Sequence, residues 1–136
     1  MVHLARIHNI HGARGRLSIK AFHRFFPLLE ERRWADAQRF LNKVEGTEDE
    51  WIEGYVQALN GMLIALKESH SSHQPYILQM KRYNGQELQN LKEGFAALSN
   101  KPVNTTFDKG YIQAWIDYVS RQLSKAKSSN YAERGV

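Results

Sequence analysis

The stretch from Ile52 to Leu66 carries the strongest folding signal in the sequence. Its large apolar residues recur at intervals of three and four, at Ile52, Tyr55, Val56, Leu59, Met62, Leu63 and Leu66. This spacing forms one continuous apolar face when the segment is wound into an α-helix. The sequence therefore predicts an amphipathic helix over about residues 48–69.

A second stripe, made of small residues, runs along the same predicted helix. Gly54, Ala58, Gly61 and Ala65 follow one another at steps of 4, 3 and 4. Glycine in a helix interior costs about 1 kcal/mol relative to alanine, so two glycines in one helix call for a packing reason. We expect these four residues to form a helix-packing seam, where a second backbone approaches closely.

The helix has a counterpart later in the chain. "GYVQA" begins at Gly54 and "GYIQA" begins at Gly110, which is 110 − 54 = 56 residues further on. An aromatic residue stands three positions before each glycine, and a shorter predicted helix and a turn precede both copies. The predicted hairpins pair residues 34–45 with 48–69 and residues 87–99 with 105–126. We expect the two repeated helices to face each other, although five shared positions do not distinguish a duplication from equivalent helical roles.

The rest of the chain fits a single all-α unit. Its 136 residues are the length of one ordinary domain, and it has no cysteine, which removes disulfides and thiolate metal sites. Gly12 and Gly15 interrupt any helix near the N-terminus. We therefore predict an extended basic arm over 1–17, one helical domain over 18–128 and a frayed tail over 129–136. The predicted fold is a compact antiparallel bundle of five to six helices with two similar hairpins.

One of these hairpins resembles a known family. Around residues 28–45, Trp34, Ala37, Leu41 and Val44 stand at the spacing that an aromatic, a small and two large apolar residues have in a tetratricopeptide (TPR) hairpin. The Trp-Leu-Gly-Tyr signature of that family is absent upstream, and the 34-residue period does not return. The resemblance implies an antiparallel helical hairpin of a protein-binding scaffold.

The charge distribution suggests what the protein binds. The net charge is +5, and Lys and Arg are concentrated near the N-terminus: residues 1–33 carry 7 − 2 = +5, residues 34–69 carry 3 − 7 = −4, and residues 70–136 carry 9 − 5 = +4. A basic segment can bind phosphate. The predicted nucleic-acid-binding residues are Arg14, Arg16, Lys20, Arg24, Arg32 and Arg33. We expect a small cytoplasmic protein that binds RNA or a ribonucleoprotein, or alternatively a protein–protein adaptor or homodimer without nucleic acid.

Catalytic and metal chemistry have weaker signals. His8 with His11 and His70 with His73 are each three apart, but glycine or serine surrounds them, and we expect neither a metal nor another cofactor. Arg6 with His11 and Arg16 with His23 resemble the Arg-x4–6-His pattern of the HEPN ribonucleases, which are all-helical proteins and usually dimers. Neither arginine is followed by the polar residue usual in that family. A ribonuclease is thus a remote alternative, and we predict no catalytic residue and no membrane-spanning segment.

Overall fold

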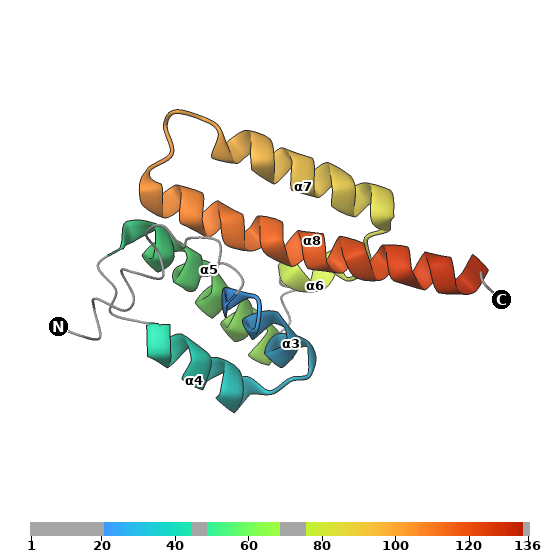
Figure 1. Ribbon diagram of the computed structural model, residues 1–136, viewed down its shortest axis with the longest axis horizontal. Helices are drawn as coiled ribbons and strands as arrows, with labels where there is room; N and C mark the ends of the chain where they lie inside the picture. The colour runs from blue at the N-terminus through green and yellow to red at the C-terminus, as the bar shows by residue number, and fades with distance from the viewer. Residues whose placement is uncertain (1–20, 45–48, 69–75, 135–136) are drawn as a thin grey trace.

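The structure, a computed structural model, describes residues 21–44, 49–68 and 76–134, with side chains as far as Lys127 in the last segment. Every regular element in these ranges is helical, and none is a strand (Figure 1). The helices are α3 (Phe25–Glu30), α4 (Trp34–Val44), α5 (Glu50–Lys67), α6 (Tyr76–Met80), α7 (Gly85–Ser99) and α8 (Thr106–Arg134). The predicted all-α fold is confirmed. The arm predicted over 1–17 lies outside the described residues.

Side chains at the helix starts explain why the helices begin where they do. The carboxylate of Asp49 accepts a hydrogen bond from the backbone N–H of Ile52 at 3.0 Å, which caps α5. Before α7, the amide oxygen of Asn84 accepts from the N–H of Glu87 at 2.8 Å, while the Glu87 carboxylate accepts from the Asn84 N–H at 3.0 Å. This reciprocal pair is a capping box. Both caps satisfy backbone donors that a helix start would otherwise leave unpaired.

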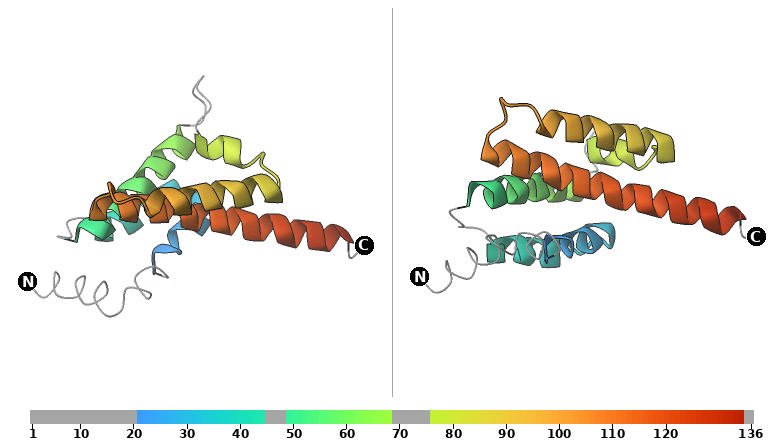
Figure 2. Two further views of the ribbon diagram at one scale, coloured as in Figure 1. Left: turned by 90° about the horizontal axis from the view of Figure 1, so that it is seen from above. Right: turned by 45° about the horizontal axis from the view of Figure 1, so that its top comes forward.

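The two predicted hairpins form the body of the molecule. Helix α4 runs antiparallel to α5, and α7 runs antiparallel to α8, whereas α5 and α8 start side by side and run in the same general direction (Figures 1 and 2). The contact between α5 and α8 is the largest between any two described helices. The core lies along this contact and under α3. Its largest fully buried side chains are Tyr55, Tyr118, Phe25, Phe26, Leu41, Ile52, Leu59, Met62, Ile77, Met80 and Val119.

The repeated glycines are the point where α5 and α8 touch. A Cβ atom on Gly54 would lie 2.0 Å from the carbonyl oxygen of Phe107, and one on Gly110 would lie 1.9 Å from the carbonyl oxygen of Trp51. Each glycine thus packs against the residue three positions before the other glycine. Because no side chain fits there, the two backbones meet directly. The repeated helices face each other, as the sequence predicted.

The small-residue seam is shorter than its sequence pattern. Gly54 and Ala58 are buried, but Gly61 is exposed, and a Cβ atom there would meet nothing within 4 Å. Ala65 is half-buried. The reason is the crossing angle, because the C-terminal half of α5 moves away from α8 (Figure 2). Only the first two of the four predicted seam residues therefore lie at the contact between these helices.

The C-terminal helix extends further than predicted. Helix α8 continues to Arg134, whereas the predicted helix covered about residues 105–126. Helix α7, which lies on the outer side of α8, fully buries only Leu88. The α7–α8 hairpin therefore has little covering on its outer face.

Candidate nucleic-acid interface

The turn between α3 and α4 has an unusual backbone. Arg32 has φ = 58°, which is the left-handed region, and is the only non-glycine residue of the described part with a positive φ. The Arg33 N–H donates to the Leu28 carbonyl at 2.8 Å, and the Arg32 N–H donates to the Leu29 carbonyl at 3.1 Å. These two bonds form a Schellman motif, whose left-handed position glycine usually occupies. Arginine at this position costs about 1 kcal/mol relative to glycine.

Beside this turn the surface is hollowed. A broad depression of about 700 Å³ is lined by Arg32, Arg33, Trp34, Asp36, Arg39 and Lys67, among others. A smaller depression of about 150 Å³ is lined by Glu30, Arg32, Trp34, Lys67 and Lys81, with Leu29, Leu66 and Leu78. The two share Arg32, Trp34 and Lys67, so they are neighbours. We call them together the basic hollow.

The basic hollow draws its cations from four places in the chain. Arg32 and Arg33 come from the α3–α4 turn, Lys67 ends α5, and Lys81 follows α6. Arg39 of α4 completes the set. Two acids also line the hollow, so its formal charge is 5 − 2 = +3. The fold thus brings together cations from residues 1–33, 34–69 and 70–136, the three segments that differ in net charge.

Ion pairs leave three of these five cations available. Asp36 pairs with both Arg33, at 2.6 Å, and Arg39. Within the described ranges, no acidic side chain pairs with Arg32, Lys67 or Lys81. An exposed cation without an acidic partner can bind a phosphate group without first breaking an ion pair.

The second acid of the hollow, Glu30, is bound on its far side. Its carboxylate accepts two hydrogen bonds from Arg121, both at 2.9 Å, and lies 2.7 Å from the ammonium nitrogen of Lys125. Burial alone would raise the pKa of Glu30, but the hydrogen bonds from Arg121 and Lys125 outweigh it and lower the pKa below its ordinary value. Glu30 therefore stays ionised, and its charge is compensated by α8.

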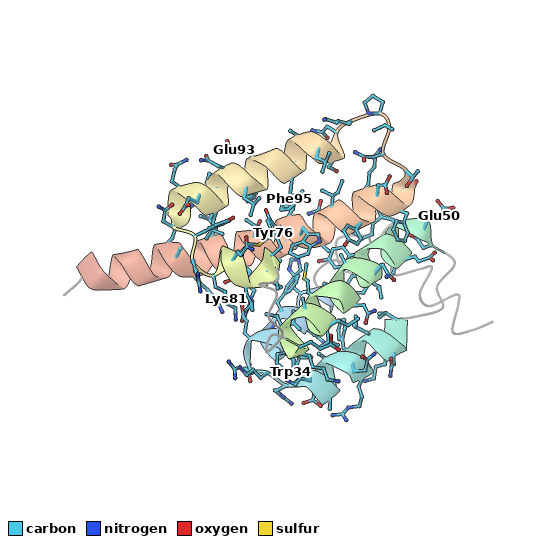
Figure 3. All side chains as sticks on the ribbon, turned by 180° about the vertical axis from the view of Figure 1, so that it is seen from behind. Trp34, Glu50, Tyr76, Lys81, Glu93 and Phe95 are labelled. Carbon is cyan, nitrogen blue, oxygen red and sulfur yellow. The ribbon has the colours of Figure 1, made fainter. Side chains whose placement is uncertain are left out.

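One aromatic residue belongs to both depressions. Trp34 is the first residue of α4, is half-buried against the core, and lines both depressions. Figure 3 shows it at the start of α4, with Lys81 labelled at the end of α6. An aromatic side chain that lines the same hollow as several cations suits nucleotides, because rings stack on the bases while cations meet the phosphates.

The predicted nucleic-acid-binding residues divide into three groups. Arg32 and Arg33 line the basic hollow. Arg24 is exposed but does not line it. Arg14, Arg16 and Lys20 lie outside the described residues. The sequence pattern did not identify the other cations of the hollow, Arg39, Lys67 and Lys81. It indicated Trp34 only as a packing residue of a TPR-like hairpin.

A second polar cluster surrounds Asp117 of α8. Its carboxylate accepts from the Tyr55 hydroxyl at 2.6 Å and from the Gln113 amide at 2.8 Å, and lies 3.1 Å from Nε2 of His23. Burial, followed by the charge of Asp117, raises the pKa of Tyr55 far above its ordinary value. Because each of these polar groups has a partner, the cluster links α5, α8 and the segment before α3 through polar contacts.

His23 of the Arg16–His23 pair is therefore already engaged by Asp117, and Arg16 lies outside the described residues. In the described ranges, no three His, Cys, Asp or Glu side chains lie close enough together to hold a metal ion. The histidine pairs at 8 and 11 and at 70 and 73 fall outside those ranges. None of the described helices has the length and apolar character needed to cross a membrane.

No family model matches this sequence, and comparison with curated proteins and with solved structures gave no match. The TPR and HEPN resemblances thus have no support from a family match.

Proposed function

We propose that this protein binds RNA, and that the basic hollow is its binding surface. One observation carries the proposal: Arg32, Lys67 and Lys81 converge around Trp34 from three separate parts of the chain and have no acidic partner among the described residues. Cations of this kind bind the phosphate backbone, and the ring adds a surface for a base. The net charge of +5 supports the same partner class.

The backbone at Arg32 gives independent support. The Schellman position favours glycine, yet an arginine stands there at a cost in stability. Residues that keep an unfavourable backbone conformation concentrate at functional sites. Arg32 lines both depressions, so the strained residue also belongs to the proposed surface.

The test is an affinity comparison between two triple variants of equal charge. The hollow variant carries Arg32→Ala, Lys67→Ala and Lys81→Ala. The control variant carries Lys101→Ala, Lys109→Ala and Lys127→Ala, which removes three exposed cations that do not line the hollow. Fluorescence anisotropy with a labelled RNA should show at least a tenfold loss of affinity for the hollow variant and a small loss for the control. Equal losses would mean that RNA responds only to net charge, and the proposed surface would be wrong.

A second candidate function rests on the uncovered end of the α7–α8 hairpin. Leu98, Val103 and Tyr111 are exposed by 41%, 80% and 37%, and all three lie near the turn between these helices. Exposed apolar side chains gathered in one place are typical of protein-binding surfaces. Light scattering over a range of concentrations tests self-association, and a dimer that Val103→Asp dissociates would favour this candidate. A monomer at all concentrations would exclude the homodimer.

A further inference from the structure

The smaller depression is roomy enough for a single phosphate group. Its volume of about 150 Å³ is several times the roughly 10–15 Å³ that one water molecule needs in a cavity. Arg32, Lys67 and Lys81 supply three positive charges at its edge. Leu29, Leu66 and Leu78 form its apolar lining, and the one acid in the lining, Glu30, has its carboxylate bound by Arg121 and Lys125.

The broader depression shares Trp34, Arg32 and Lys67 with the smaller one. Because Trp34 lines both, a base stacked on it from the broad side would leave its phosphate beside the smaller one. With about 700 Å³, the broad depression has room for a nucleobase and its sugar. The two depressions therefore have room for the two parts of one nucleotide, and residue types that suit them.

Trp34 is held in place before any ligand binds. Its position at the start of α4 follows directly from the Schellman hydrogen bonds of Arg32 and Arg33, and its side chain packs against the core. A ring fixed in this way loses little conformational freedom when a base stacks on it.

We infer that the basic hollow selects single-stranded RNA, by stacking one unpaired base on Trp34 and placing the adjoining phosphate among Arg32, Lys67 and Lys81. The inference rests on the proposed RNA-binding function and specifies its substrate class. In a duplex the bases are stacked on one another and their faces are not accessible to an aromatic side chain. A duplex therefore meets only the cations of the hollow.

The experiment compares three labelled ligands by fluorescence anisotropy. They are a 12-nucleotide RNA, the same RNA annealed to its complement, and a single strand of equal length and charge without bases. The wild-type protein should bind the single strand at least tenfold more tightly than either of the other two. Trp34→Ala should weaken single-strand binding by about 5- to 150-fold, the range measured for loss of one stacked base, and leave duplex binding unchanged. Trp34→Phe, which keeps a ring, should retain most of the affinity.

The outcomes separate this inference from the function on which it rests. If no RNA binds, the proposed function itself fails. If RNA binds but the duplex or the baseless strand binds as well as the single strand, only the inference fails. Should Trp34→Ala lose its fold, as a thermal melt would show, the wild-type comparison with the baseless strand decides the question alone.

Discussion

Replacing either repeated glycine with alanine should disrupt the contact on which the fold depends. At Gly54 the new Cβ would lie 2.0 Å from the Phe107 carbonyl oxygen, and at Gly110 it would lie 1.9 Å from that of Trp51. Ordinary carbon–oxygen contacts of this kind are about 3.3 Å or longer, so α5 and α8 must separate by more than about 1 Å. The obstacle is backbone, which cannot rotate away as a side chain could.

Two opposing effects set the magnitude. Alanine gains about 1 kcal/mol of helix propensity over glycine. Forcing an extra methyl into a packed contact costs about 1–3 kcal/mol, and more when backbone has to move. Because these substitutions separate the largest contact between two described helices, we place their packing cost at or above the upper limit of that range. After the gain in helix propensity, we expect a net loss of about 2 kcal/mol or more. The double variant should lose less than the sum, because the first change already separates the helices.

The chain provides matched controls. Gly61 lies in the same helix as Gly54, Gly94 lies in α7, and a Cβ at either would meet nothing within 4 Å. Gly61→Ala and Gly94→Ala should each raise the free energy of unfolding by about 0.5–1 kcal/mol. Urea unfolding followed by circular dichroism measures all four variants. If Gly54→Ala is as stable as Gly61→Ala, the glycine contact does not limit the approach of the helices and this reasoning is wrong.

Three further predictions concern the groups around the basic hollow and the core. Arg32→Gly should raise the free energy of unfolding by about 1 kcal/mol, because glycine adopts the left-handed backbone conformation without strain. The same variant should bind RNA more weakly. A variant that is less stable than the wild type and binds RNA equally well would refute both expectations. Since the folded pKa of Glu30 lies below its unfolded value of 4.5, its stabilising contribution is present above pH 4.5 and is lost as pH falls further. The stability of Glu30→Gln should therefore depend less on pH in acid than that of the wild type. An acid unfolding transition identical to the wild-type one would contradict the stabilising role of the Glu30 contacts with Arg121 and Lys125. Burial, and then Glu30, raises the pKa of Tyr118 to about 12, so the stability that it confers is present below pH 10 and is lost between pH 10 and 12 by about 1.4 kcal/mol per pH unit. Tyr118→Phe should flatten this alkaline loss, and an unchanged slope would contradict the assignment.

The fold could be predicted because its signals are local. Apolar residues at helical spacing gave α5 and α8, and the repeated Gly-Tyr-x-Gln-Ala pattern identified the glycines at which these helices meet. Gly61 misled the prediction because it continues the same spacing, while the crossing angle that removes it from the contact depends on how whole helices pack. The spacing of residues within one helix does not determine that crossing angle.

The candidate site could be predicted only in part, for the same reason. Arg32 and Arg33 are neighbours in a basic stretch, so the sequence pointed to them. Lys67 ends α5 and Lys81 follows α6, so they join Arg32 and Arg33 only after α5 and α6 have packed beside the α3–α4 turn. The left-handed backbone conformation at Arg32 could not be predicted either, because arginine as a residue type does not indicate it.

The salt dependence of RNA affinity tests the central claim most directly. Each phosphate neutralised on a single strand contributes about −0.7 to the slope of log affinity against log salt concentration. Removing Arg32, Lys67 and Lys81 together should therefore make the slope shallower by about 2 relative to wild type, while removing Lys101, Lys109 and Lys127 should leave it nearly unchanged. A slope that is the same for wild type and the hollow variant would show that these three cations do not contact phosphate.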